Sequence, residues 1–331
     1  MKIYLLSFLL LFQFPFVFNE ALELPASSPI TDSQQKLNSN ESKVVNIVFK
    51  SSDGGQTWQD ISEGLPGNLQ GDGFFANDSG LYLRTGNEIY HSKLNSTAPF
   101  WKKEIFPDEQ SSIARAKTGI FAYNNDGQFL QRKNTTNVLS AMHSTFQEEV
   151  CTIFESDGGA VLVGCKIGIF KSTNSGKTWK QVHTGGGVMK LVESNGVLMA
   201  TGHKGILRST DDGESWDWVI SEGGVGISVE PINGGFAAIT YNTVSKTRRV
   251  RTSYDGGKNW QSIDAGLPAE ASIASIIQIG DHFFCGHPAG IFRSSNKGKT
   301  WKLLLPSIEQ KVFNLSVSGN VIYAIPRDGG C

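Results

Sequence analysis

The chain has almost no net charge. Its 30 Lys and Arg residues against 31 Asp and Glu give a formal net charge of -1 over 331 residues. Such a chain has no general attraction to nucleic acid or to anionic membranes. The densest basic run, which contains Lys246, Arg248, Arg249 and Arg251, alternates as the outward face of a strand does, and no exposed aromatic residues are interleaved with it. We therefore expect a solvated strand edge there and no nucleic-acid partner.

Long apolar runs are absent after the first residues of the chain. The run Ile3–Phe18 is nearly unbroken and follows a single lysine, but it is short for a membrane span. It predicts a secretory signal peptide over residues 1–20, with a retained N-terminal anchor as the alternative. Residues 21–43 are rich in Ser, Asn, Gln and Pro without apolar periodicity, which predicts a disordered leader. We expect a folded domain over residues 44–331, secreted and without a membrane span.

Cysteine is scarce, with four residues in the whole chain. Cys151 and Cys165 flank the turn Ser156–Gly159 almost symmetrically, and an antiparallel hairpin would place them opposite each other. We expect a disulfide between them, which is compatible with export. Cys285 falls in an expected strand and is either buried or paired with Cys331, the last residue. Cys331 is alternatively free to pair with another chain.

Asn-x-Ser/Thr sequons are present in small number. In a eukaryotic secreted protein they would be glycosylation sites on the surface. One sequon, at Asn40, falls in the expected leader, and the others fall in the expected domain at Asn77, Asn95, Asn134 and Asn314.

Glycine is abundant, with 37 residues, and much of it belongs to a repeated octet. The octet reads S-x-[DN]-x-G-x-[TSN]-W, and successive copies recur at about forty residues through much of the chain, as in repeat architectures. The positions that define the copies are Ser51, Asp53, Gly55 and Trp58; Ser172, Asn174, Gly176 and Trp179; Ser209, Asp211, Gly213 and Trp216; Ser253, Asp255, Gly257 and Trp260; Ser294, Asn296, Gly298 and Trp301.

Each residue type in the octet has a structural role. Ser and Asp or Asn place short acceptors beside backbone N–H groups in a tight turn, Gly tolerates a positive φ, and Trp packs its indole on neighbouring strands. Apolar pairs such as Ile169-Phe170 and Ile291-Phe292 precede the octets, so each octet is expected to be a hairpin turn between two strands. We assign the acidic residues of the octets to turn capping and not to catalysis.

The octet is that of the Asp-box, also called the BNR repeat, and from about Lys43 onward the chain resembles sialidase-like and sortilin-like β-propellers. In size it is similar to the single-ring propellers of the photosystem II assembly factor Ycf48/Hcf136 group. The resemblance implies an all-β propeller whose octet turns lie on the outer rim, away from the ligand-binding face.

Counting the repeats predicts seven blades. The octet positions begin at residues 51, 92, 132, 172, 209, 253 and 294, although the copy at 92 is degenerate and no octet is recognisable at 132. The last hairpin, over residues 311–325, supplies the first two strands of a blade, and the N-terminal segment supplies a third and fourth. Pairing them in one blade would close the ring and remove an exposed sheet edge. Six blades is the alternative, if the unit without an octet is not a blade.

In propellers of this kind, the turns between a blade's second and third strands share one face with the connections between blades. The first set of loops is mostly basic here, and the connections between blades are acidic. A functional interpretation treats the basic set as a site for an anionic or sugar-like group. The alternative is that the two sets are solvated loops that neutralise each other. The candidate ligand-binding residues are Arg84, Lys166, His203, Lys204, His287 and Arg327.

Several motifs of enzymes are missing. A resemblance to sialidases implies an arginine triad and an early Arg-Ile-Pro motif, but no arginine precedes Ser51, and the similar tripeptide Ile325-Pro326-Arg327 has another order at the other end. The chain has no nucleophile elbow, no phosphate loop and no Cys/His metal spacing. We assign no catalytic residue, cofactor or metal.

These observations predict a secreted, non-enzymatic binding or scaffold propeller that engages a protein or glycan through its channel-side loops. The alternatives are a glycoside hydrolase or sialidase-like lectin, and a structural extracellular component cross-linked through Cys331.

Overall fold

The computed structural model describes residues 48–66, 73–78, 80–85, 88–105, 112–117, 119–123, 129–133, 139–142, 146, 148–222, 224–268 and 272–328. The predicted signal peptide and leader, the start of the predicted domain, the sequon at Asn134 and the terminal Cys331 lie outside the described residues. No helix in the described ranges is long and apolar enough to cross a membrane.

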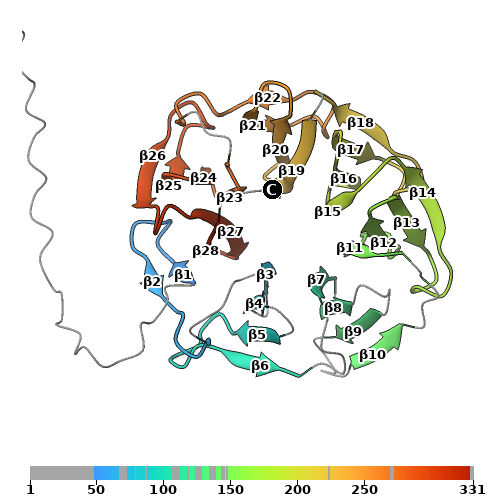
Figure 1. Ribbon diagram of the computed structural model, residues 1–331, viewed down its shortest axis with the longest axis horizontal. Coiled ribbons are helices and arrows are strands. Elements are labelled where there is room, and N and C mark those ends of the chain that lie inside the picture. The colour runs from blue at the N-terminus through green and yellow to red at the C-terminus, as the bar shows by residue number, and fades with distance from the viewer. Residues whose placement is uncertain are drawn as a thin grey trace, which may run out of the picture. The chain divides into compact units, whose positions relative to one another are not determined.

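The described strands form seven four-stranded antiparallel sheets arranged as the blades of one ring, so the fold is a seven-bladed β-propeller (Figure 1). We number the blades from the one that contains both ends of the domain, and we order the strands of each blade from the central opening outward. The unit without an octet, blade 3, is a complete blade, which rules out the six-bladed alternative. The strands are β27 (Val312–Ser318), β28 (Val321–Arg327), β1 (Phe49–Ser51) and β2 (Gln59–Asp60) in blade 1; β3 (Gly73–Asn77), β4 (Gly80–Thr85), β5 (Glu88–Ser92) and β6 (Lys102–Glu104) in blade 2; β7 (Ser112–Ala116), β8 (Gly119–Tyr123), β9 (Phe129–Lys133) and β10 (Leu139–Met142) in blade 3; β11 (Val150–Glu155), β12 (Val161–Cys165), β13 (Gly168–Ser172) and β14 (Lys180–Thr184) in blade 4; β15 (Val188–Ser194), β16 (Val197–Gly202), β17 (Gly205–Ser209) and β18 (Asp217–Ile220) in blade 5; β19 (Gly224–Ile232), β20 (Gly235–Asn242), β21 (Thr247–Ser253) and β22 (Gln261–Ser262) in blade 6; β23 (Ser275–Ile279), β24 (His282–His287), β25 (Gly290–Ser294) and β26 (Lys302–Pro306) in blade 7.

Blade 1 closes the ring as the sequence predicted. Its two inner strands come from the C-terminal hairpin and its two outer strands from the N-terminal segment. The antiparallel pairing of β1 with β28 sets Phe49 opposite Ala324 and Ser51 opposite Ile322. Because the outer strands are hydrogen-bonded onto the C-terminal hairpin, neither end of the domain leaves an unpaired strand between blades 7 and 2.

The hydrophobic core is divided among the junctions between blades. Among the described residues, seven clusters of buried side chains can be distinguished, and each lies between two neighbouring blades. At the junction of blades 7 and 1, for example, Phe284 and Ile291 pack with Phe49, Phe313 and Ile322. The strands therefore carry apolar residues on both faces, since each inner blade surface contacts a neighbour. This arrangement makes every blade depend on the next one around the ring.

The octets form the turns between the third and fourth strands. In each, the serine Oγ accepts the N–H of the octet glycine, and the Asp or Asn Oδ1 accepts the N–H of the following Thr, Ser or Asn. The glycines have φ near +80°, a region that L side chains rarely adopt. In the octet of blade 5 the two distances are 2.9 Å, for Gly213 N to Ser209 Oγ, and 3.0 Å, for Ser215 N to Asp211 Oδ1.

The octets also contact neighbouring blades. The octet tryptophans pack into the junction with the preceding blade, and Trp301 Nε1 donates to the carbonyl of Ile263 there at 2.8 Å. In four blades the residue just before the octet serine is a cation that reaches the corresponding turn of the next blade. The contacts run from Lys50 to the Leu94 carbonyl, from Lys171 to Asp212 and Glu214, from Arg208 to the Gly256 carbonyl and from Arg293 to the Gly54 carbonyl. These links between blades were not predicted from the sequence.

The predicted disulfide between Cys151 and Cys165 is not formed, and both are free thiols. The reason is the strand register. A bulge between Val150 and Thr152 leaves Cys151 unpaired and places Val150 opposite Cys165. Cys285 is also free, and it is buried at the junction of blades 6 and 7.

The described sequons differ in exposure. Asn95 is exposed in the turn between β5 and β6, whereas Asn77 is buried at the end of β3 and Asn314 is half-buried on the inner strand β27. The folded domain therefore offers a glycan far more room at Asn95 than at Asn77 or Asn314.

Candidate functional site

The two sides of the ring differ in what they present. Because each blade is antiparallel, the turns between its second and third strands emerge on the same side as the connections between blades, and the octet turns emerge on the other side. We call the first side the channel-side face. It carries the residues that the sequence analysis selected as candidates, apart from those in the octets.

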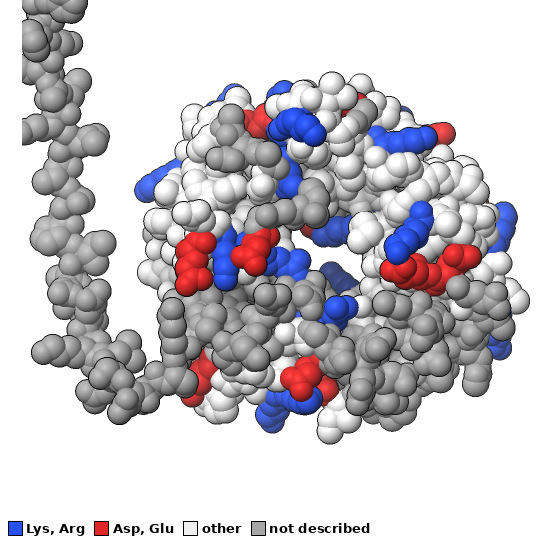
Figure 2. Space-filling view, in the orientation of Figure 1, with Lys and Arg blue, Asp and Glu red and all other residues white. Residues whose placement is uncertain are grey.

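Basic side chains surround the central opening of the ring (Figure 2). The inner strands β7 and β15 carry Arg115 and Lys190, and the second strands of blades 2 and 1 carry Arg84 and Arg327 toward their channel-side ends. Lys190 forms an ion pair with Glu230 on the neighbouring inner strand β19. Charged side chains therefore line part of the opening, and the ion pair of Lys190 with Glu230 joins the inner strands of blades 5 and 6.

Arg84 and Arg327 are held by neutral polar groups of neighbouring strands. Arg84 Nη1 donates to Ser112 Oγ of blade 3 at 2.7 Å. With its amide oxygen turned toward Arg327, Asn314 accepts from Nε and Nη1 of that guanidinium at 3.3 Å. These contacts fix the two guanidinium groups near the channel-side end of the opening, where the sequence placed them.

Several charges of this face are paired with each other. Lys166, in the turn between β12 and β13, lies 2.5 Å from Glu149 in the connection before β11. Arg251 Nη2 lies 2.6 Å from Glu222, which belongs to the connection between blades 5 and 6. At Lys166 a basic turn and an acidic connection neutralise each other, which is the alternative that the sequence left open. At Glu222 the acidic connection is neutralised by an arginine within strand β21.

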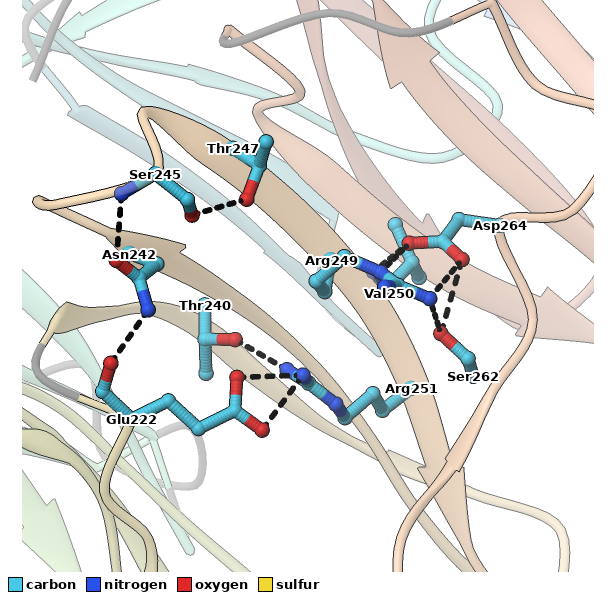
Figure 3. A network of polar contacts seen from close by, with 10 residues as sticks. All are labelled: Glu222, Thr240, Asn242, Ser245, Thr247, Arg249, Val250, Arg251, Ser262 and Asp264. Carbon is cyan, nitrogen blue, oxygen red and sulfur yellow. Dashed lines mark hydrogen bonds and ion pairs between the residues drawn. The ribbon is translucent and has the colours of Figure 1, made fainter.

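The basic run of blade 6 is not a uniformly solvated strand edge. Arg248 is buried, lies over the ring of Tyr241 and donates to the Ile273 carbonyl, so it faces the interior. Figure 3 shows the two arginines that follow. Arg249 binds both carboxylate oxygens of Asp264. Arg251 binds Glu222 and also donates to Thr240. The prediction was wrong for Arg248 and Arg251 because the long hairpin of β20 and β21 packs against the connections on both sides of its blade.

His287 has a structural environment. It is fully buried at the end of β24, and both of its ring nitrogens are used. Nδ1 accepts the N–H of Ala289 at 3.0 Å, and Nε2, which then carries the proton, donates to the Pro268 carbonyl at 3.0 Å. A ligand on the channel-side face cannot reach this imidazole without unfolding the turn, so the structure argues against a binding role.

His203 and Lys204 are exposed in the turn between β16 and β17, as expected for contact residues. The structure adds two side chains that the sequence analysis missed, His183 at the end of β14 and Trp218 on β18. Both imidazoles meet the Trp218 ring edge-on, with centroids 5.7 Å away for His183 and 6.3 Å for His203. A signal was present in the sequence: Trp218 is the tryptophan that occupies no octet position, intact or degenerate.

Within the described part of the chain, no three His, Cys, Asp or Glu side chains come together as a group that could hold a metal ion. The candidate site is therefore a set of cationic, imidazole, aromatic and apolar side chains on the channel-side face. Such a set suits recognition by hydrogen bonds, charge and stacking.

No family model matches the chain, and no curated protein sequence does. Solved structures do match it. A Ycf48 protein bound to a D1 peptide has a TM-score of 0.54 at 11% identity, covering 78% of this chain and 95% of that one. Ycf48 from Cyanidioschyzon merolae has a TM-score of 0.55 at 11% identity, covering 79% of this chain and 98% of that one.

A GH74 xyloglucanase from Xanthomonas campestris has a TM-score of 0.61 at 16% identity, covering 78% of this chain and 51% of the enzyme. This chain thus spans about half of the enzyme but nearly all of the Ycf48 proteins. At these identities the likeness shows the β-propeller fold alone.

Proposed function

We propose that this chain is an exported propeller of the Asp-box group that binds without catalysis, and that its partner is an extended polypeptide lying across the channel-side face of blades 4 to 6. The observation that carries the proposal is a row of exposed apolar side chains on these consecutive blades. Ile167 is 44% exposed, Met189 64% and Val244 85%. We call these three residues the apolar row.

The positions of the apolar row follow from the repeat. Ile167 and Val244 lie in the turns between the second and third strands of blades 4 and 6, and Met189 is the second residue of β15, the inner strand of blade 5. All three therefore lie on one face, across three neighbouring blades. Large apolar side chains that are exposed together on one face, with polar neighbours, are typical of a surface that binds another protein.

Lysines accompany the row at equivalent turns. Lys166, Lys204 and Lys246 each lie in the turn between second and third strands of blades 4, 5 and 6, and all three are exposed. Lys166 is paired with Glu149, whereas no ion pair in the described ranges involves Lys204 or Lys246. Basic and apolar side chains at equivalent turns of consecutive blades suit an extended segment better than a compact ligand, because the turns of neighbouring blades would contact residues several positions apart along it. The likeness in fold to a Ycf48 protein solved with a peptide supports a polypeptide partner.

Export is supported by the apolar run Ile3–Phe18, which has the length and flank of a signal peptide. Absence of cleavage after this run in a secretory host, with the chain retained in the cytosol, would remove this part of the proposal. The binding proposal can be tested with the folded protein alone.

The test of binding uses a phage-displayed library of random 15-residue peptides as the probe, panned on the full chain. We expect enriched peptides whose affinity falls at least tenfold when Ile167, Met189 and Val244 are replaced together by serine, since each buries apolar area in the complex. The matched control is Leu303→Ser on the outer strand β26, another exposed apolar residue on a different surface. Failure to enrich any peptide, or equal loss in the control, would refute the proposal. Specific binding to a glycan array, with no binding of peptides, would show that the partner is a carbohydrate and not a polypeptide.

A further inference from the structure

Trp218, His183, His203 and Lys204 form a cluster at the junction of blades 4 and 5, beside the apolar row. We call it the Trp218 cluster. The Trp218 indole is half-buried and lies over Gly202, where a Cβ would come within 2.7 Å of the indole ring. The absence of a side chain at Gly202 therefore leaves room for the indole at the end of β16. The two imidazoles contact the same indole, His183 from blade 4 and His203 from blade 5.

The loop Gly185–Gly187, which joins blade 4 to blade 5, sets the positions of both imidazoles. A Cβ on Gly186 would lie 1.9 Å from the His203 ring, and Gly186 has a φ of 103°. A Cβ on Gly185 would lie 2.9 Å from His183 Nε2. Nothing lies within 4 Å of the corresponding position on Gly187. Glycine is thus needed at the first two positions for the cluster to have its shape, and it is not needed at the third.

The polar groups of the cluster are two imidazoles, each of which can donate a hydrogen bond, and the ammonium group of Lys204. In the described ranges no ion pair involves His183, His203 or Lys204. His183 Nε2 is buried and has no hydrogen-bond partner there, which is unusual for a polar atom in a folded protein. Burial, together with the nearby His203 and Lys204, lowers the pKa of His183. The Nε2 atom of this imidazole is therefore shielded from solvent and lies near the basic groups of His203 and Lys204.

We propose that the Trp218 cluster binds a carboxylate of the polypeptide partner together with the apolar or aromatic residue next to it. Lys204 and His203 donate to the carboxylate, and the Trp218 indole packs against the neighbouring side chain. An anionic group fits a site that offers donors and positive charge, and the indole adds apolar contact next to it. The inference rests on the proposed function, and it makes the partner segment acidic.

The test uses four short synthetic probes: the acetylated and amidated tetrapeptide Gly-Glu-Phe-Gly, its Gln counterpart, an amidated peptide with Phe at its end, and the same peptide with a free terminal carboxylate. The readout is the indole N–H resonance of Trp218 in the full chain, assigned by its loss in Trp218→Phe. We expect the Glu peptide to bind about tenfold more tightly than the Gln peptide, as for a charge-assisted hydrogen bond. Comparison of the last two probes shows whether a chain terminus serves as well as a side chain.

Paired variants test the geometry. Gly186→Ala displaces His203 and is expected to weaken the Glu peptide at least fivefold, while Gly187→Ala leaves its affinity within twofold. Lys204→Gln is expected to remove most of the difference between the Glu and Gln peptides. Thermal unfolding of each variant shows whether the ring is intact, and Lys204→Gln keeps the proposal testable if Gly186→Ala fails to fold.

Equal binding of the Glu and Gln peptides would overturn the carboxylate site, and the polypeptide proposal would still stand if library peptides depend on the apolar row. A shift of the Trp218 resonance by glucuronic or sialic acid, with none by any peptide, would also overturn it in favour of an acidic sugar. Loss of all peptide binding, in this assay and in the library, would refute both proposals together.

Discussion

Replacing Ser209 by alanine tests whether the octets act as structural turns. Ser209 is 2% exposed, its Oγ accepts the N–H of Gly213 at 2.9 Å, and its hydroxyl donates to Asp211 Oδ1 at 2.7 Å. Alanine would leave the Gly213 N–H buried without an acceptor. An unsatisfied buried donor costs about 1–3 kcal/mol, so we expect a loss of about 2 kcal/mol in the free energy of unfolding. For a domain of this size that lowers the melting temperature by about 4 °C.

The matched control is Ser215→Ala in the same octet. The Ser215 hydroxyl donates to Asp211 Oδ2 at 2.5 Å, but the residue is exposed, so water replaces the lost bond and we expect a change below about 1 kcal/mol. Differential scanning calorimetry measures both variants. A melting temperature for Ser209→Ala equal to that of the wild type, or a loss no larger than in Ser215→Ala, would show that the serine acceptor does not hold the turn. Loss of peptide binding by Ser209→Ala without loss of stability would contradict the assignment of the octets to structure.

Three further outcomes are expected. Hydrogen bonds from the threonine of its octet lower the pKa of Asp53 to about 2. This carboxylate therefore contributes stability that is present above pH about 4 and is lost as the pH falls toward 2. Asp53→Asn should make the urea unfolding midpoint depend less on pH over that window, and an unchanged pH dependence would contradict this. Arg293 donates to the Gly54 carbonyl across the ring closure at 3.2 Å. Arg293→Gln should therefore lower the free energy of unfolding, measured by urea denaturation, by about 1 kcal/mol. An unchanged free energy would show that the link does not stabilise the ring. In a eukaryotic secretory host, peptide mapping should find a glycan at Asn95 and none at Asn77, which is 6% exposed; the reverse result would refute the exposure argument.

The fold could be predicted because its determinants are local and repeated. The octet specifies a turn through contacts among residues four positions apart, such as Gly213 N with Ser209 Oγ, and those contacts can be inferred from one copy of the motif. The phase of the copies then gave the number of blades, including the unit without an octet. Closure of the ring followed from counting strands at the two ends.

The candidate site could be predicted only in part. Lys166, His203 and Lys204 could be placed on the channel-side face because the turns between second and third strands emerge there. His287 is the last residue of β24, just before a turn of the same kind, yet it is buried, because the connection before its blade covers it. The sequence pattern at the end of a strand does not show what a neighbouring connection will cover.

The sequence by itself determined the strands, their order within each blade, the octet turns and the blade in which the two ends meet, since each of these depends on short-range hydrogen bonding and apolar periodicity. The tertiary structure decided what happens between blades. The bulge at Cys151 that separates it from Cys165, the links from Arg293 and its equivalents to the next octet, and the meeting of His183 with Trp218 all join residues of different strands or blades. Their geometry depends on strand register and on how adjacent sheets twist against each other, and neither is encoded in any single repeat.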